Sequence, residues 1–357
     1  MSQGVTTTLS RRRSGEAGAL PFAALLRDIP DLPRELERLL GQVPAGRVTT
    51  YGDLARALGD VGAARWVGEH LLAHSHDEPC RCHRVVRVDG DIGLYITGNA
   101  GEKVERLRRD RVPVAGGRVD LDRFRFHEFH SSAPLAALRE WQLCVPDQLK
   151  LAPLTHAPQR VGGVDVSYIS RTEAVASFVL VDVASLELVW STSVRAAVTF
   201  PYLSGYLSFR ELPILLKLFG QVCAAKKLPD VTFVDGNGIL HPRRAGSASC
   251  FGLAAGIPTI GVGKKLLCGR VEGGDSIGTD ARPIVHNDEE LGFVMQTGSA
   301  RRPFFVSPGH LVDLPATLYV TRLVLGDRRL PMPIVLADRE SRREAARIKA
   351  MHPSRTE

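Results

Sequence analysis

The sequence predicts an α/β protein in which a mixed sheet near the C-terminus is preceded by a small helical part. Three observations support this prediction. From residue 161 onward, short apolar runs alternate with helical stretches, as they do in layered α/β folds. Before residue 113, the regular pattern is that of short amphipathic helices. The length of 357 residues exceeds the usual size of one hydrophobic core, so two domains are expected.

The helical part begins with three predicted helices. "PRELERLLGQV" places Leu36, Leu39 and Leu40 at helical spacing after a proline. "TTYGDLARALG" offers a threonine cap and a glycine stop, and "GAARWVGEHLLAH" follows after a tight turn. Two short helices joined in this way predict a helix-turn-helix, although a plain helical hairpin fits the same pattern.

The predicted sheet contains several buried strands. One helix, "LAALREWQLCVPDQLKL", precedes them, and another, "FRELPILLKLFGQVCAA", lies among them. The irregular residues 113–135 predict the boundary between the two parts. The predicted strands are "VGGVDVSYI", "AVASFVLVDV", "LELVWSTSVRAAV", "VTFVDGNGI" and "PTIGVGKKL".

Composition narrows the class of protein. The net charge of +7 is compatible with a polyanionic partner, because Lys and Arg side chains neutralise phosphates. Six scattered cysteines suit a reducing compartment, and no apolar run is long enough to span a bilayer. The sequence therefore predicts a cytoplasmic protein without a membrane segment, and a flexible basic tail at residues 1–22. Composition leaves the oligomeric state open.

Three acidic residues stand where carboxylates are unusual. Asp165 lies within an apolar strand, Asp235 ends another strand before a glycine-rich turn, and Glu211 begins a helix. A strand-end aspartate more often caps a helix or pairs with an arginine. Three acids in one α/β domain are nevertheless the hard oxygen ligands that Mg²⁺-dependent phosphoester chemistry requires. "SPGHLVDL" adds His310 and Asp313 in a predicted loop.

Four motifs resemble those of the endonuclease V family. "VGGVDVSY", "PYLSGYLSFRELP", "VDGNGILHPRRAGSASCFGLAAGIPTIGVGKKLLCG" and "SPGHLVDL" occur in the family's order, within a domain predicted at residues 135–357. The resemblance implies a ribonuclease H-like fold and cleavage of the second phosphodiester 3′ to deoxyinosine. It also implies Mg²⁺ as the cofactor, with Mn²⁺ as a substitute. The catalytic residues implied by position are Asp165, Glu211, Asp235, His310 and Lys264, the first three as metal ligands.

The same resemblance implies residues for base flipping. Tyr202 matches the wedge residue that fills the gap left by the extruded base, and His241 matches part of the wall around that base. Hypoxanthine pairs weakly, which lowers the cost of extrusion. The sequence departs from the family at Ser204, where proline is usual. Relatives of this fold act on DNA or on RNA, so cleavage of inosine-containing RNA is an alternative function.

The N-terminal motifs resemble a second family. "VPAGRVTTYGDLARALG", "AARWVGEHLL", "CHRVVRVDGDIGLY" and "KVERLRRD" follow the order of the DNA-binding domain of O6-alkylguanine-DNA alkyltransferases. The resemblance implies a winged-helix-like domain at residues 23–115 and a linker at 116–134. It implies transfer of an alkyl group from guanine O6 in damaged DNA to a cysteine, which consumes the protein. The residues implied by position are the acceptor Cys82, the proton relay His83, the orienting Asp110 (where glutamate is usual), and the DNA-contacting Tyr51, Arg65 and Arg84.

The stretch "CRCHRV" departs from this second family. Arg81 replaces a proline and His74 replaces an asparagine hinge. Arg81 either favours the Cys82 thiolate through its charge or displaces the loop that presents the thiol. The alternative to alkyl transfer is a domain that only senses alkylated guanine. Zinc binding by Cys80, Cys82 and His83 is a further interpretation, disfavoured because adjacent ligands converge poorly and no fourth ligand is visible.

Overall fold

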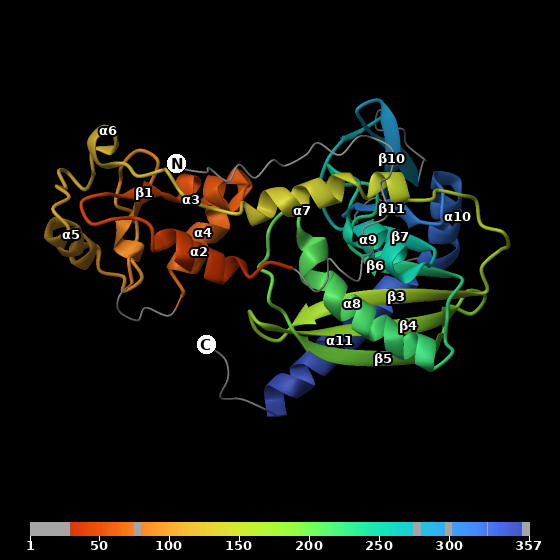
Figure 1. Ribbon diagram of the computed structural model, residues 1–357. Coiled ribbons are helices and arrows are strands. Elements are labelled where there is room, and N and C mark those ends of the chain that lie inside the picture. The colour runs from red at the N-terminus through yellow and green to blue at the C-terminus, as the bar shows by residue number, and fades with distance from the viewer. Residues whose placement is uncertain (1–28, 75–79, 274–279, 297–301, 327, 352–357) are drawn as a thin grey trace, which may run out of the picture.

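The chain forms two units joined by helix α7, as Figure 1 shows. We call residues 29–126 the N-terminal unit and residues 134–351 the C-terminal unit. Among the described residues, no helix is both long and apolar enough to cross a bilayer. The basic tail predicted at residues 1–22 lies outside the described part. The computed structural model describes residues 29–74, 80–273, 280–296, 302–326 and 328–351.

The N-terminal unit consists of short helices around a two-stranded parallel ladder. Thr50 and Asp53 form a capping box at the start of α3, and Gly59 ends that helix in the left-handed conformation. The predicted threonine cap and glycine stop are thereby confirmed. The elements of this unit are α2 (Leu32–Leu40), β1 (Thr49–Thr50), α3 (Tyr51–Leu58), α4 (Ala64–Leu71), β2 (Val85–Val86), α5 (Ala100–Arg109) and α6 (Leu121–Phe124).

Part of the segment predicted as a linker is bound to the N-terminal unit. The backbone N–H of Val119 donates to the Gly90 carbonyl at 2.9 Å, and that of Phe126 donates to the Val48 carbonyl at 2.7 Å. The chain then reaches α7 (Pro134–Leu143), which begins the C-terminal unit with a proline in its first turn.

The C-terminal unit is built on a nine-stranded mixed sheet with the order β5-β4-β3-β6-β7-β11-β10-β9-β8. Strands β3, β6 and β7 run parallel, and the other neighbouring strands are antiparallel. The five predicted strands are confirmed as β3 to β7. The bounds are β3 (Arg160–Tyr168), β4 (Glu173–Asp182), β5 (Leu188–Ala197), β6 (Val231–Asp235), β7 (Thr259–Gly263), β8 (Arg270–Val271), β9 (Ala281–His286), β10 (Glu289–Met295) and β11 (Phe304–His310).

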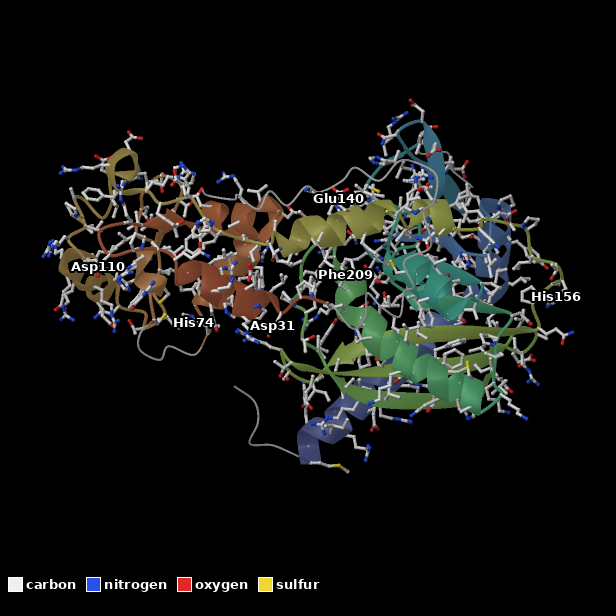
Figure 2. The ribbon with its side chains drawn as sticks, in the orientation of Figure 1. Asp31, His74, Asp110, Glu140, His156 and Phe209 are labelled. Atoms are coloured by element: carbon white, nitrogen blue, oxygen red, sulfur yellow. The ribbon has the colours of Figure 1, made fainter. Side chains whose placement is uncertain are left out.

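Helices cover both faces of this sheet. Side chains alternate along β4, so that Phe178 joins the core under α7, α8 and α9 while Val179 joins the core under α10 and α11. Trp141 of α7 lies edge-on to Phe209 of α8, with ring centroids 5.4 Å apart; Figure 2 labels Phe209. The helix bounds are α8 (Leu207–Ala224), α9 (Ser247–Ala255), α10 (Leu314–Leu325) and α11 (Met332–Met351).

The loop predicted for "SPGHLVDL" is wrong in its first half. Ser307 to His310 complete strand β11, which pairs antiparallel with β7. Asp313 then caps α10 by accepting the backbone N–H of Ala316 at 2.8 Å. The apolar run before the motif carries the strand further than the glycine and proline suggest, because β11 is buried between two neighbours.

The two units contact each other at the turn after α3. Gly59 has a φ of 102°, and a Cβ there would lie 2.5 Å from the backbone nitrogen of Ala136 in α7. The hydroxyl of Tyr206 donates to Asp60 Oδ2 at 2.5 Å. Leu58 and Trp66 share one apolar core with side chains of the C-terminal unit. The helix pair formed by α3 and α4 in the N-terminal unit is therefore packed directly against the loop that precedes α8.

Candidate functional sites

An acidic cluster lies where β3 and β6 meet. Val164 pairs with Val234 in the parallel register, so the next residues, Asp165 and Asp235, come side by side. Asp338 of α11 completes a group whose carboxylate oxygens lie within 4.8 Å of one another. The sheet therefore brings together two of the three predicted metal ligands, and α11 adds an acid that sequence analysis missed.

Helix α11 reaches the cluster because β3 has a glycine, with no side chain, at the point of contact. A Cβ at Gly163 would lie 2.2 Å from the carbonyl oxygen of Pro333, so only glycine permits this approach. The hydroxyl of Ser341, one turn after Asp338, hydrogen-bonds to Asp165 Oδ2. Ser341 is fully buried, so α11 both supplies a carboxylate and fixes the orientation of another.

Glu211, the third predicted ligand, lies outside that group of three. The Tyr168 hydroxyl donates to Glu211 Oε1 at 3.1 Å. Burial, then the negative charge of Asp235, raises the pKa of Glu211 to about 8. Burial and a hydrogen bond shared with Asp235 raise the pKa of Asp165 to about 7. The acids stand close enough to disfavour one another's ionisation.

This donor set fits a divalent cation. Carboxylates that repel one another and are cut off from water are stabilised as anions by a hard cation, which prefers oxygen ligands. Lys264 partly serves this purpose, since its ammonium lies 2.5 Å from Asp235 Oδ2. Burial lowers the pKa of Lys264, but the charge of Asp235 and this hydrogen bond outweigh it and raise the pKa. Lys264 is thus cationic at the edge of the cluster.

A cavity of about 480 Å³ opens beside these acids. Asp235, Lys264, Tyr202 and His241 all line it. Tyr202 is 68% exposed, whereas His241 is buried. The structure thereby places the predicted wedge, the predicted base-contacting histidine and two predicted catalytic residues around one cavity, which is large enough for a nucleobase.

His241 holds one tautomer. Its Nδ1 accepts the backbone N–H groups of Arg243 at 3.1 Å and Ala245 at 3.3 Å. The hydrogen must therefore reside on Nε2, which donates to the Gly205 carbonyl at 3.2 Å. Burial lowers the pKa of His241 to about 4, with the charge of Arg243 adding to the effect. His241 is a neutral residue that fixes the loop carrying Tyr202.

His310 lies outside the group of three acids and toward the other end of β7 from them, since it pairs with Thr259 whereas Asp235 pairs with Val262. It ends β11, its backbone N–H donates to Thr259 Oγ1 at 3.0 Å, and its Nδ1 accepts the backbone N–H of Lys150 at 3.3 Å. Burial lowers the pKa of His310, so the ring is neutral near pH 7. Its role at the metal site stays a prediction.

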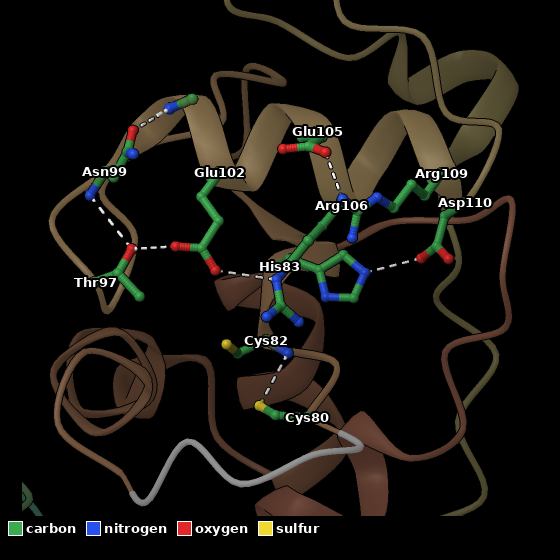
Figure 3. Close-up of polar contacts among 11 residues, drawn as sticks. Cys80, Cys82, His83, Thr97, Asn99, Glu102, Glu105, Arg106, Arg109 and Asp110 are labelled. Atoms are coloured by element: carbon green, nitrogen blue, oxygen red, sulfur yellow. Dashed lines mark hydrogen bonds and ion pairs between the residues drawn. The ribbon is translucent and has the colours of Figure 1, made fainter.

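The N-terminal unit contains the second predicted site, shown in Figure 3. Cys82 and His83 begin a 3₁₀ turn and are both buried. His83 Nε2 lies 2.9 Å from Asp110 Oδ2, so the ring donates from Nε2 to the carboxylate. His83 Nδ1 is buried and has no hydrogen-bond partner among the described residues. The structure therefore brings together the predicted pair of His83 and Asp110, with one ring nitrogen left as an acceptor.

Arg84 is held inside this unit. Its Nε donates to Asp110 Oδ2 at 2.5 Å and its Nη1 donates to the Val43 carbonyl at 2.7 Å. Arg81 donates to the Gly41 carbonyl. Neither guanidinium is directed at the Cys82 thiol by these bonds, and the contact of Arg84 with DNA stays a prediction. Burial raises the pKa of Asp110, but the hydrogen bonds from Arg84 and His83 outweigh it and lower the pKa.

Two residues near Cys82 were missed by sequence analysis. The Tyr95 side chain is buried and hydrogen-bonds to Cys82. The Lys103 ammonium is also buried and donates to the carbonyls of Val85 and Ile92. Burial lowers the pKa of Lys103 to about 8. A lysine on a helix rich in arginine gives no sequence signal of burial, whereas Tyr95 stands in a motif that sequence analysis quoted.

The remaining predicted DNA contacts lie on the helix pair. Tyr51 begins α3 and is half-buried, and Arg65 of α4 is exposed and pairs with Glu69 at 2.8 Å. Arg65 lies close enough to Tyr202 of the C-terminal unit to interact with it electrostatically. The two residues predicted to enter a duplex, one from each unit, therefore lie within electrostatic range of each other.

Comparison with known proteins identifies both parts. The endonuclease V family profile matches residues 145–339. The chain belongs to the endonuclease V family. Residues 32–112 match the DNA binding domain of 6-O-methylguanine DNA methyltransferase. A relative from Picrophilus torridus, a bifunctional methyltransferase/endonuclease, is 36% identical over 297 residues, which cover 82% of this chain and 90% of the relative. This endonuclease V thus carries the same two parts as that relative.

Solved structures agree with the endonuclease V fold. The catalytic domain of human endonuclease V is 30% identical, with a TM-score of 0.56, covering 62% of this chain and 99% of the human one. Endonuclease V from Streptomyces avermitilis is 34% identical, with a TM-score of 0.54, covering 60% and 93%. Endonuclease V from Ciona intestinalis, solved with a 24mer DNA containing an inosine followed by a ribo-adenosine, is 27% identical, with a TM-score of 0.54, covering 60% and 98%. Endonuclease V enzymes depend on a metal ion, in agreement with the acidic cluster.

Proposed function

We propose that this endonuclease V is a DNA repair enzyme whose C-terminal domain, residues 135–357, cleaves the second phosphodiester 3′ to deoxyinosine. The observation that carries the proposal is the cavity that joins Tyr202 and His241 to Asp235 and Lys264. A base that leaves the duplex enters a space walled by a neutral histidine, while its backbone passes the acids. The DNA bound in the Ciona intestinalis relative supports the substrate class.

Asp165, Asp235 and Glu211 would hold Mg²⁺, with Mn²⁺ as a substitute, and Asp338 stands ready as a further oxygen donor. When bound, the ion supplies Lewis-acid stabilisation of charge on the phosphoryl and leaving oxygens. Ser341 orients Asp165, and Lys264, which hydrogen-bonds to Asp235, would contact a phosphate there. Tyr202, exposed at the mouth of the cavity, would fill the gap in the stack.

Cleavage of paired oligonucleotides tests this function. Inosine-containing DNA and RNA of one sequence are incubated with the full-length enzyme in Mg²⁺, and the cleavage positions are mapped. We expect DNA cleavage at the second phosphodiester, and loss of cleavage with retained binding in Asp235→Ala. Asp280→Ala is the matched control, because Asp280 pairs with Arg322 on the surface at 2.5 Å. Faster cleavage of RNA than of DNA would assign the domain to inosine-containing RNA instead.

The N-terminal domain, residues 23–115, would remove alkyl groups from guanine O6. In this step the bond between O6 and the alkyl carbon breaks, a thioether forms at Cys82, and the thiol proton ends on the guanine. Hydrogen bonding with Cys80, then burial, raises the pKa of Cys82, so the resting thiol is protonated and needs a base. His83 Nδ1 is an unprotonated acceptor, and Asp110 would stabilise the ring when it gains the proton.

A labelled-methyl assay tests this second activity. DNA carrying O6-methylguanine with a radioactive methyl group is mixed with the full-length protein, and label on the protein is counted. We expect one methyl group per chain in the wild type and none in Cys82→Ser. Cys250→Ser, which changes a buried thiol in α9, keeps the wild-type count. An unlabelled wild-type protein that still binds the alkylated DNA would make this domain a sensor of the lesion.

A further inference from the structure

Three side chains with soft-metal donors converge beside the acceptor cysteine. The ligand atoms of His74, Cys80 and Cys82 lie within 4.8 Å of one another. His74 Nε2 lies 3.1 Å from Cys80 Sγ, and the backbone N–H of Cys82 points at Cys80 Sγ at 3.4 Å. Figure 3 shows Cys80 and Cys82 on the same side of the turn. His83, the histidine considered in the sequence, instead faces Asp110.

The histidine ring is oriented as a metal ligand would be. His74 Nδ1 lies 3.1 Å from the carbonyl oxygen of Leu71, which can only accept, so Nδ1 carries the hydrogen. The lone pair of neutral His74 is then on Nε2, the atom that faces Cys80. A backbone carbonyl that holds the far ring nitrogen is the usual outer partner of a zinc-bound histidine.

From this geometry we propose that His74, Cys80 and Cys82 bind a Zn²⁺ ion, with the fourth coordination position open. A tetrahedral ion with Zn–S bonds of about 2.3 Å needs sulfur atoms about 3.8 Å apart, and the two sulfurs, which lie within 4.8 Å of each other, exceed that separation by at most about 1 Å. Two neighbouring thiols and an imidazole are soft donors that favour Zn²⁺ over Mg²⁺.

Charge favours the same ion. Two thiolates and a neutral imidazole give a zinc site no net charge, which suits the low exposure of Cys82. Without a cation, the two sulfurs disfavour each other's ionisation, as two carboxylates do in the acidic cluster. A bound Zn²⁺ ion would hold Cys82 as a thiolate, so His83 would have a thiol proton to remove only in the metal-free protein. This consequence for alkyl transfer rests on the proposed function, whereas metal binding itself does not.

Cobalt substitution tests the site without any DNA. Reduced full-length protein is titrated anaerobically with Co²⁺, and the sulfur-to-cobalt charge-transfer absorption is recorded; Zn²⁺ is then added. We expect one equivalent of absorbing Co²⁺ per chain, displaced by one equivalent of Zn²⁺. His74→Ala and Cys80→Ser should weaken Co²⁺ binding at least tenfold. Cys144→Ser changes an exposed thiol elsewhere and should bind as the wild type does. The oxygen ligands of the acidic cluster give no such absorption.

Thiol protection gives a second measurement in the wild type, independent of how variants fold. Zn²⁺ should slow iodoacetamide labelling of Cys80 and Cys82 at least tenfold and leave Cys144 unaffected. Equal labelling with and without Zn²⁺, together with no charge-transfer absorption, would overturn the proposal. A Cys80–Cys82 disulfide that remains after the protein has been freshly treated with a reductant would also overturn the proposal. Because the methyl count is a separate assay, failure of zinc binding and failure of alkyl transfer are distinguishable.

Discussion

Removing the Asp110 carboxylate tests how the acceptor site is held together. Asp110 accepts from His83 Nε2 at 2.9 Å and from Arg84 Nε at 2.5 Å. The side chains of Arg84 and Asp110 are only 11% and 16% exposed. In Asp110→Ala, the Arg84 guanidinium keeps its bond to the Val43 carbonyl but loses its counter-ion in a place with little water.

The expected cost follows from that burial. Breaking a buried ion pair by removing one partner costs about 3–5 kcal/mol, because the remaining charge is uncompensated. The retained Val43 bond and the remaining exposure place the cost at the low end, about 3 kcal/mol. Since 1.4 kcal/mol corresponds to a factor of ten, the opening equilibrium of this region should rise on the order of 100-fold.

Amide hydrogen exchange measures this locally, which a global melt of a two-part chain does not. Protection of α5 and of Val85–Val86 is compared between wild type and Asp110→Ala. The matched control is Asp89→Ala: Asp89 pairs with Arg118 at 3.1 Å, but their side chains are 46% and 58% exposed. An exposed pair contributes at most about 1 kcal/mol, so the control should change protection less than about fivefold.

A third variant, Asp110→Glu, tests whether the carboxylate itself holds this region together. Asp110→Glu should recover most of the protection, because a longer carboxylate can still reach both partners. If Asp110→Ala loses no more protection than Asp89→Ala, the buried pair does not hold the turn that carries Cys82 and His83. The argument from burial would then be wrong, whatever the variant does to alkyl transfer.

Three further predictions follow from contacts elsewhere. Burial raises the pKa of Asp53, but hydrogen bonds from Arg125 and Thr50 outweigh burial and lower the pKa. The ionised carboxylate therefore stabilises the fold above its unfolded pKa near 3.9, and this stability is lost as the pH falls through the lower pKa of the folded state. The stability of Asp53→Asn at decreasing pH is measured by amide hydrogen exchange in α3, and this loss of stability should be absent in the variant. Gly163→Ala should separate α11 from β3, lower the free energy of unfolding by about 3 kcal/mol and abolish cleavage. Gly220→Ala is the control: its Cβ would meet open space, so this variant should melt at or above the wild-type temperature. Tyr206→Phe removes the bond to Asp60 and should raise exchange in residues 59–64 about tenfold without changing Mg²⁺ affinity; unchanged exchange would mean that the bond does not couple the units.

Local signals were sufficient where one element decides its own boundary. The capping box of Thr50 and Asp53 and the terminal Gly59 are short-range chemistry, and the structure confirms them. Strands β3, β4, β6 and β7 are largely buried apolar runs that can be recognised from the sequence alone, and the edge strand β5 is only partly buried. Strands β9 and β10 carry charged side chains beside partly exposed ones, so no comparable run marks them.

Acids and thiols that meet only through tertiary packing could not be paired from the sequence. Asp338 stands in "LADRESRR", which has the composition of a solvated helix face. It joins Asp165 only because Gly163 lets α11 approach β3. His74 lies six residues before Cys80, across a segment with no regular pattern, so its ring could not be placed against a sulfur. In each case tertiary packing, which a local motif does not encode, brings the side chains together.

The contact between the units bears on how the two activities share DNA. Arg65 and Tyr202, each proposed to enter a duplex where a base has left it, lie close enough to interact. Successive base pairs are about 3.4 Å apart, and each insertion unstacks and bends its own step. Two insertions into one short duplex segment would each distort the base pairs between them. We therefore expect one short duplex segment to engage one domain at a time.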